Sequence, residues 1–231
     1  MKKEEILLRY NSINENIKKI KEKYNIGYDI NIIAVSKYSS IETIKEFLSL
    51  NIDLPLAESK AQSLRDRAGE IANLKDNVKW HFIGRIQSNK VKYIVKYADL
   101  IQSVDSIEIA EYINKEAQKN NKIQDILIQF NISDENQKGG FILDDYINVY
   151  NNIIKMPNIS LKGLMAIGKD TEDTVIIEEE FEKLNIIYKD INKKYNNTLS
   201  VLSMGMSSDY ELAIKHGSNM VRIGSSFLGN S

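Results

Sequence analysis

The chain has 231 residues, and its 31 Lys and Arg residues against 32 Asp and Glu residues give a formal net charge of −1. This balance argues against a nucleic-acid-binding protein, because such proteins carry an excess of basic residues. The chain contains no cysteine, which excludes disulfides and thiolate metal sites.

The hydropathy and composition of the chain predict a cytoplasmic protein made of one domain. Its first residues lack the apolar core of a signal peptide, and no apolar run approaches the roughly 20 residues of a membrane span. The lack of cysteine is compatible with a reducing cytoplasm. No segment rich in Pro, Gly and Ser divides the sequence, so we expect one domain over residues 1–231. The charged faces of its helices favour a monomer.

The first predicted element is an amphipathic helix over residues 3–24, whose apolar residues recur at spacings of three and four. After it, short apolar runs alternate with amphipathic stretches. We expect strands at 31–37, 53–57, 79–83, 100–103, 123–132, 159–165, 199–202 and 219–223. We expect helices between them at 40–50, 59–73, 88–97, 105–119, 143–154, 174–194 and 208–216.

This alternation of strand and helix predicts a parallel sheet. Eight predicted strands fit a single (β/α)8 barrel of the TIM type, with the helix over residues 3–24 as an addition. A doubly wound open sheet is the alternative. In a barrel the chemistry is located at the carboxyl ends of the strands.

Lys37 ends the first predicted strand and is the first candidate site residue. Pleat alternation places it on the same face as Ile33 and Val35, where burial would lower the pKa of its ammonium. A lysine with a lowered pKa attacks carbonyl groups and forms Schiff bases. The alternative is that Lys37 marks the point where the strand meets solvent.

The loops after the last two predicted strands are the second candidate region. The segments 203–209 and 222–226 are rich in Gly and Ser, and loops at these positions of a barrel often hold phosphate. Plain turns are the alternative, because Gly and Ser are common in turns. Arg222 shares a face with Met220 and Gly224, so it points either at a ligand or at an ion-pair partner inside the barrel.

Three other polar residues are candidates for the barrel interior. Gln129 and Asn131 share a face with Leu127, so their amides either point into the barrel mouth or bond to neighbouring strands. His81 is more typical of a hydrogen-bonded core residue than of a catalyst. With only two histidines and no cysteine, the chain cannot build a His-rich metal site.

An amine at one strand end and a phosphate cradle across the same rim suit a ligand with an aldehyde and a phosphate. Pyridoxal 5'-phosphate (PLP) has both groups. Lys37 would hold the aldehyde, the Ser/Gly loops the phosphate, and Arg222 the pyridine nitrogen. A sugar phosphate that forms a Schiff base with Lys37 is the alternative ligand.

Five ordered motifs resemble those of the pyridoxal phosphate homeostasis proteins and span nearly the whole chain. They are Ile33-Ala-Val-Ser-Lys37, Trp80-His-Phe-Ile-Gly84 with Gln87-Ser-Asn-Lys90, Asn131-Ile-Ser-Asp-Glu-Asn136 with Lys138 and Gly140, Gly163-Leu-Met-Ala-Ile167, and Leu202-Ser-Met-Gly-Met-Ser207 with Val221-Arg-Ile-Gly224. The resemblance implies a barrel like the N-terminal domain of alanine racemase, with PLP on Lys37.

The resemblance also implies roles for individual residues. Ser203, Gly224 and Ser225 match phosphate-binding positions, and Arg222 matches the arginine that faces the pyridine nitrogen. Ser59 stands where the family usually has an asparagine, so the resemblance does not carry over the amide contact of that asparagine.

The resemblance implies a PLP carrier without an established turnover reaction. Such a carrier buffers and delivers PLP, a form of vitamin B6, and apo PLP-dependent enzymes are its candidate recipients. A PLP-dependent amino-acid racemase, whose missing acid/base comes from a neighbouring chain, is the alternative. A weak racemase or transaminase side activity is compatible with the carrier.

Overall fold

The structure is a computed structural model that describes residues 1–74, 77–133, 135 and 138–229. The strands are β1 (Asn31–Val35), β2 (Leu56–Glu58), β3 (Trp80–Phe82), β4 (Leu100–Val104), β5 (Gln124–Gln129), β6 (Ile159–Met165), β7 (Val201–Met206) and β8 (Met220–Ile223). The α-helices are α1 (Lys3–Lys23), α2 (Ile41–Ser49), α3 (Ala61–Ile71), α4 (Val91–Tyr97), α5 (Ile107–Lys119), α6 (Tyr146–Ile153), α7 (Thr174–Lys194) and α8 (Tyr210–Lys215). Short 3-10 turns, Ser88–Lys90 and Leu143–Asp145, precede α4 and α6.

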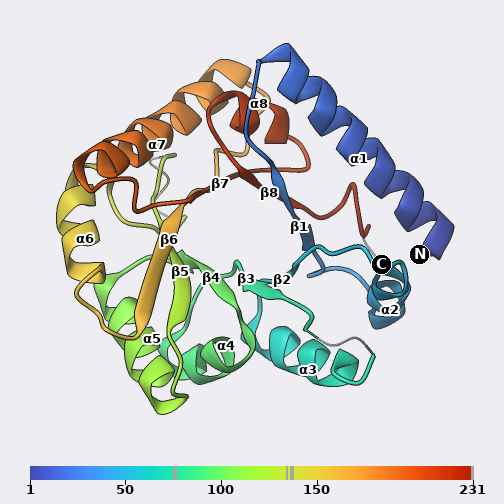
Figure 1. Cartoon of the computed structure of the whole chain (residues 1–231), viewed down its shortest axis with the longest axis horizontal. Coiled ribbons are helices and arrows are strands. Elements are labelled where there is room, and N and C mark those ends of the chain that lie inside the picture. The colour runs from blue at the N-terminus through green and yellow to red at the C-terminus, as the bar shows by residue number, and fades with distance from the viewer. Residues whose placement is uncertain (75–76, 134, 136–137, 230–231) are drawn as a thin grey trace.

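Within the described residues, eight parallel strands form a closed barrel in the order β1 to β8 (Figure 1). Each strand pairs with the next one along the chain, and β8 pairs with β1 from Asn31–Met220 to Ala34–Ile223. This closure confirms the predicted TIM-like barrel and excludes the open sheet.

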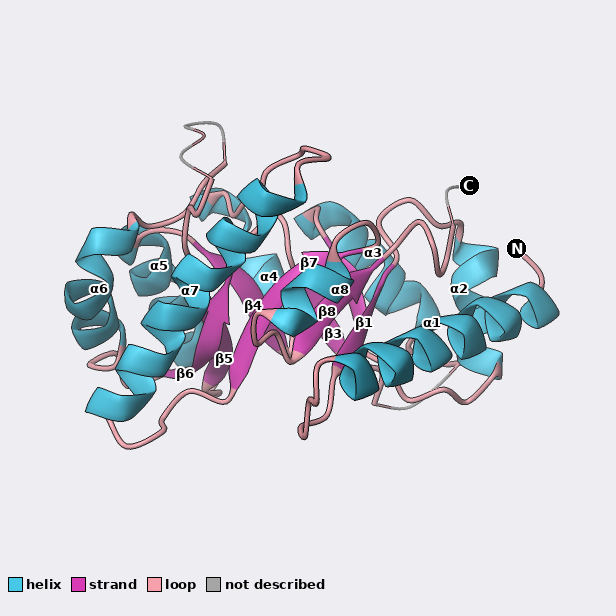
Figure 2. Cartoon of the chain, turned by 90° about the horizontal axis from the view of Figure 1, so that it is seen from above, coloured by secondary structure: helices cyan, strands magenta, loops and turns pink. Residues whose placement is uncertain are grey.

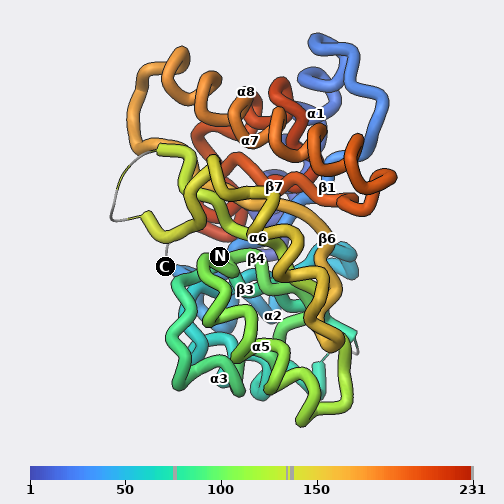
Figure 3. Tube along the Cα trace, turned by 90° about the vertical axis from the view of Figure 1, so that its left-hand side faces the viewer, coloured from blue at the N-terminus to red at the C-terminus, as the bar shows by residue number. Residues whose placement is uncertain are grey.

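The helices form a ring around the barrel (Figure 1), and in Figure 2 the helices, in cyan, flank the strands, in magenta. Helices α7 and α8 cover one side of it and α3 and α5 the opposite side (Figure 3). Helix α1 lies between α8 and α2. In the described part of the chain no helix follows β8, so α1 takes the place of an eighth outer helix.

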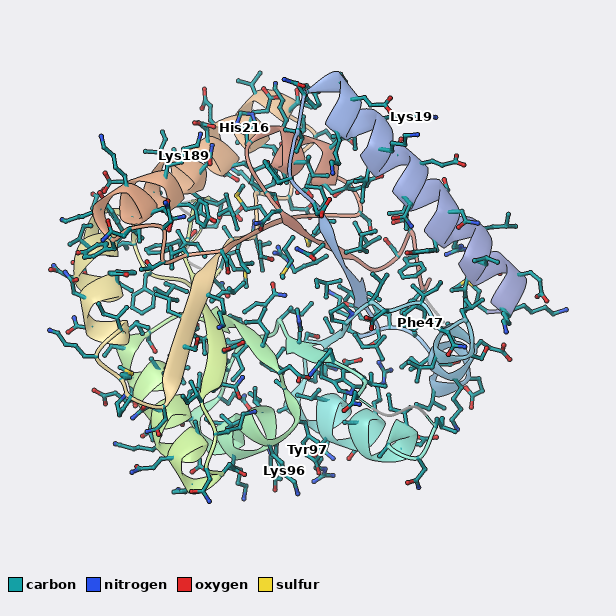
Figure 4. The ribbon with its side chains drawn as sticks, in the orientation of Figure 1. Lys19, Phe47, Lys96, Tyr97, Lys189 and His216 are labelled. Carbon is teal, nitrogen blue, oxygen red and sulfur yellow. The ribbon has the colours of Figure 1, made fainter. Side chains whose placement is uncertain are left out.

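Helix α1 stays on the barrel because of one apolar stripe. Its buried residues, Ile6, Ile13, Ile17 and Ile20, recur at helical spacings, as the sequence predicts. The segment after β8 packs against the same region, where the Phe227 ring meets that of Phe47 at 5.6 Å and edge-on. Phe47 points inward from α2 (Figure 4).

Two apolar layers position the strands. Alternate strand residues fill the barrel interior, among them Ile33, Val35, Leu100, Leu127 and Met220, and the others meet the helices. This alternation follows from the pleat of a strand. The predicted outward face of β5 is confirmed, because Ile126 and Ile128 belong to the outer layer.

The predicted strand ends differ from the observed ones where side chains or proline intervene. The first strand ends at Val35, so Lys37 lies outside it, in a turn. Pro55 precedes β2 and does not lie within it, since proline has no N–H to donate to a sheet. Two serines cap helices: the Ser40 and Ser106 hydroxyls accept the N–H groups of Thr43 and Ile109.

Among the described residues, no helix combines the length and the apolar character that crossing a membrane requires.

Candidate functional site

A cavity of about 310 Å³ opens at the carboxyl ends of β1, β3, β7 and β8. It is lined by Val35, Lys37, Tyr38, Ile83, Met206, Ser207, Ser208, Arg222, Gly224, Ser225 and Gly229. A larger cavity of about 840 Å³ opens at the amino-terminal end, but charges in its lining pair with each other, as Lys79 does with Asp99. Barrel chemistry belongs to the carboxyl end, so the smaller cavity is the candidate site.

Lys37 lies two residues past the end of β1 and lines this cavity with Val35. Its side chain is exposed, with the Nζ atom 4.9 Å from the centre of the Tyr38 ring. The expectation of a buried ammonium is therefore wrong. The lysine meets the cavity from its solvent-exposed side and is open to an incoming ligand.

A buried ion pair fixes the turn that carries Lys37. The Glu58 side chain at the end of β2 is 1% exposed and accepts the Ser36 hydroxyl at 2.6 Å. Arg67 of α3 donates to this carboxylate and to the carbonyl of Ser36, and it reaches the carbonyl of Ser39 at 2.7 Å. The backbone on both sides of Lys37 is thus tied to β2 and α3.

Arg222 of β8 forms the wall of the cavity on the barrel side and is 4% exposed. It donates to the carbonyl and hydroxyl oxygens of Ser203, at 3.0 and 2.7 Å, and to the carbonyl of Ala166 at 2.8 Å. Burial lowers the pKa of Arg222 to about 10, and the nearby Asp209 carboxylate opposes this shift. The guanidinium therefore stays protonated at neutral pH.

The loops after β7 and β8 bring small polar groups to the same cavity. The Ser207 hydroxyl accepts the N–H of Gly224 at 3.3 Å, which joins the two loops. Ser208 and Ser225 are exposed. In the described part of the chain, the N–H of Ser225 has no hydrogen-bond acceptor, so it is available to a ligand. These hydroxyl and N–H donors suit the oxygens of an anion.

Four of the five predicted site residues, Lys37, Arg222, Gly224 and Ser225, therefore line one cavity. Ser203 does not line it. Its side chain is fully buried below Arg222 and donates to the Oε1 atom of Gln102 at 2.7 Å. The loop 203–209 reaches the cavity through Ser207 and Ser208.

The backbone of β7 is irregular between Ser203 and the two serines that reach the cavity. Gly205 has a φ of +89°, and the pairing of β7 with β8 shifts register between Ser203 and Met206. This irregularity breaks the simple alternation of side chains along the strand. A sequence pattern does not reveal a register shift, although the glycine marks a place where one can occur.

The other polar candidates support the structure and do not line the cavity. Gln129 donates to the carbonyl of Gly139, and Asn131 donates to those of Glu135 and Lys138, so both amides hold the loop after β5. Asp134 and Asn136 of the motif that begins at Asn131 lie outside the described residues.

His81 is a core residue, as the sequence favours. Its Nδ1 atom lies 2.9 Å from the Nε2 atom of Gln102. Burial lowers the pKa of His81 to about 4, so the ring is neutral at physiological pH. The described residues also contain no group of three or more His, Asp or Glu side chains able to hold a metal ion.

Comparison with known proteins identifies the family. Residues 8–231 match the alanine racemase N-terminal domain. The pyridoxal phosphate homeostasis protein of Aquifex aeolicus is 34% identical over 222 residues, which are 96% of each chain. The chain belongs to the pyridoxal phosphate homeostasis protein family. Its relative from Buchnera aphidicola (Schizaphis graminum) is 35% identical and covers 93% of this chain and 96% of its own length.

Solved structures agree on the fold. A protein of unknown function from Bifidobacterium adolescentis superposes with a TM-score of 0.90 at 27% identity, over 97% of this chain and 95% of that one. PipY of Synechococcus elongatus, in a structure with PLP bound, gives a TM-score of 0.85 at 24% identity, over 97% of this chain and all of that one.

Proposed function

We propose that the chain binds PLP in the carboxyl-end cavity, through a Schiff base on Lys37, and takes part in intracellular PLP homeostasis. The observation that carries the proposal is the meeting of an amine, a guanidinium and several hydroxyl and N–H donors in one cavity. The family name and the PLP in the structure of PipY support the same cofactor.

The donor set fits PLP group by group. The Lys37 amine suits the aldehyde, and the Ser207, Ser208 and Ser225 hydroxyls suit the phosphate. A guanidinium has five N–H groups, and Arg222 uses three of them on Ser203 and Ala166. Two remain for an acceptor such as a pyridine nitrogen. The cavity volume, about 310 Å³, is at the lower end of the roughly 300–1,000 Å³ of small-molecule sites.

Each residue has one task in this proposal. When bound, PLP supplies an aldehyde for the amine and a ring that withdraws electrons. The Lys37 nitrogen bonds to the aldehyde carbon, and one water molecule leaves. The serine hydroxyls and the Ser225 N–H neutralise and orient the phosphate. Arg222 donates to the ring nitrogen and, because it stays charged, delivers no proton to it.

We infer a carrier without turnover. An unprotonated ring is a poorer electron sink, and PLP enzymes rely on that sink to stabilise carbanions. Among the described residues that line the cavity, the titratable side chains are Lys37, Tyr38 and Arg222. A racemase needs acid/base groups on both faces of the substrate, and this lining offers no carboxylate or histidine.

The first test is the absorbance spectrum of the protein with PLP, before and after borohydride reduction, followed by peptide mass mapping. We expect a Schiff-base band and a reduced label on the peptide that contains Lys37. The Lys37→Ala variant should lose both. Lys19→Ala removes an exposed lysine of α1, far from the cavity (Figure 4), and should keep both. A label on another lysine would overturn the assignment.

The second test separates the carrier from the racemase. Amino acids are incubated in deuterated water with the PLP-loaded protein, and exchange of the α-proton is followed by NMR. We expect exchange no faster than with free PLP. Exchange that is robust and lost in Lys37→Ala would establish an enzyme.

We further propose that apo PLP-dependent enzymes receive the PLP, that the protein acts in the cytoplasm, and that it is a monomer. Mixing the loaded protein with an apo aminotransferase measures the transfer directly as recovered activity. In the control, the apo aminotransferase receives free PLP at the concentration that the loaded protein releases when no aminotransferase is present. Light scattering measures the mass against the 26.5 kDa of one chain.

A further inference from the structure

A second cavity at the carboxyl ends of the strands lies beside the ends of β2 and β3. Its volume is about 240 Å³, and it is formed by the residues that begin α3 and by the segment after β3. Gln87 and Lys90 of the motif that follows β3 line it, whereas neither lines the PLP cavity. This motif therefore has no task in the proposed PLP site.

Three cations line this second cavity, which we call the cationic pocket: Lys60, Arg85 and Lys90. No Asp or Glu is part of its lining. Within the described residues, no ion pair or side-chain hydrogen bond engages any of the three cations. Asp105 is near enough to Arg85 for its pKa to respond, but the two groups form no ion pair. Lys60 and Arg85 are exposed and Lys90 is half-buried, but in the described part of the chain none of the three bridges to a carboxylate as Lys45 does to Glu70.

These three residues differ from charges scattered over the surface because all of them line one cavity. Like charges that face a shared cavity repel each other, and a bound anion removes that repulsion. The backbone adds donors at the same place. Lys60 caps α3 without a side-chain hydrogen bond, and the first turn of this 11-residue helix has no acidic residue, so its free N–H groups have no protein acceptor.

The walls of the cationic pocket are held together by backbone contact. A Cβ atom on Gly84 would lie 1.8 Å from the carbonyl oxygen of Ser59, so the chain after β3 touches the chain after β2. Ser59 itself lines the pocket. The cations are thus presented by two segments whose spacing is fixed before any ligand binds.

We propose that the cationic pocket binds a phosphate group, as inorganic phosphate or as the phosphate monoester of a small molecule. Three cations and a helix start offer more charge and more donors than a single carboxylate can use, whereas a phosphate dianion has oxygens for several donors. This proposal does not depend on PLP binding at Lys37.

The test is amide NMR of the full chain during titration with inorganic phosphate, with chloride at equal ionic strength as the comparison. We expect saturable shifts at residues 60–62 and 87–90 with phosphate and none with chloride. Equal shifts with both salts would reduce the effect to ionic strength and overturn the proposal, as would an absence of shifts at these residues.

Matched variants assign the shifts to the pocket. The triple variant Lys60→Gln, Arg85→Gln and Lys90→Gln should weaken phosphate binding at residues 60–62 at least tenfold, and Lys90→Gln alone should weaken it less. The control removes the same charge from exposed positions elsewhere, with Lys19→Gln, Lys155→Gln and Lys189→Gln, and should bind as the wild type does. Equal weakening in the two triple variants would overturn the proposal.

Two further titrations identify the source of the phosphate and separate this site from the first. If PLP shifts the signals of residues 60–62 and pyridoxal does not, the pocket is assigned to phosphate monoesters. If only inorganic phosphate shifts these signals, the pocket is assigned to free phosphate. In Lys37→Ala the shifts at 60–62 should persist. Their loss in that variant would show that they come from the PLP cavity.

Discussion

Replacing Arg67 with methionine should destabilise the barrel and loosen the turn that carries Lys37. Arg67 supplies the charge opposite Glu58, whose side chain is 1% exposed, while that of Arg67 is 20% exposed. In Arg67→Met the carboxylate keeps only the Ser36 hydroxyl at 2.6 Å. The carbonyl groups of Ser36 and Ser39 lose a donor as well.

The magnitude follows from the burial of Glu58. Removing one partner of a buried ion pair costs about 3–5 kcal/mol, because a charge is left in an apolar environment. A domain has a total stability of roughly 5–15 kcal/mol, so the loss is a large part of it. The matched control is Lys45→Met, which breaks a pair with Glu70 whose side chains are 42% and 49% exposed. An exposed pair contributes about 0.2–1 kcal/mol.

The assay is urea unfolding of both variants and of the double variant Glu58→Gln/Arg67→Met. The double variant should recover part of the loss, because it leaves no buried charge. At a temperature where circular dichroism shows Arg67→Met to be folded, borohydride should trap less PLP on Lys37 in it than in the wild type. A loss of stability no larger than that of Lys45→Met would refute the reasoning about burial. Undiminished trapping would refute the positioning of Lys37.

Three other perturbations test single side chains. Burial lowers the pKa of His81 to about 4, so between pH 4 and about pH 6.5 only the unfolded chain binds a proton at this residue. The free energy of unfolding should therefore fall by up to about 3 kcal/mol as the pH drops through this range. His81→Gln should flatten this pH dependence in urea unfolding. Ser203→Ala leaves a buried N–H of Arg222 without its acceptor, so thermal unfolding should show a loss of about 1–3 kcal/mol, while the affinity for PLP falls less than in Ser225→Ala. Gly205→Ala should lower the melting temperature, since its φ is +89° and its Cβ would lie 2.6 Å from a methyl group on α8.

The sequence predicts the barrel well because its main signal is local. Apolar periodicities of two and near four mark strands and helices one by one, and their strict alternation leaves few topologies. The pairing of β1 with β8 joins residues far apart in the sequence, yet eight predicted strands favour a barrel in which the first strand pairs with the last. Strand ends depend on contacts between strands: the first strand stops at Val35, and the Ser36 hydroxyl beyond it bonds to Ala57 and Glu58 of β2.

The site is predicted less completely for the same physical reason. Lys37, Arg222, Gly224 and Ser225 follow strands whose ends must meet at one rim, so their convergence could be predicted. The choice among the serines of the loop 203–209 depends on depth in the barrel, because Ser203 lies below Arg222, and no sequence pattern reports that depth. The partnership of Glu58 with Arg67 depends on how α3 packs over β2, and nothing in their spacing indicates it.

The exposure of Lys37 bears on delivery more than on capture. Releasing an aldehyde from a lysine consumes one water molecule, which has to reach the carbon bonded to the amine. Enzyme sites that close over their substrates exclude water and so protect such bonds. Here Lys37, Ser208 and Ser225 are all exposed, whereas Arg222 is buried. In the proposed complex, the buried Arg222 at the barrel side and the exposed amine at the solvent side would leave the bond to PLP open to hydrolysis, which would suit the proposed carrier.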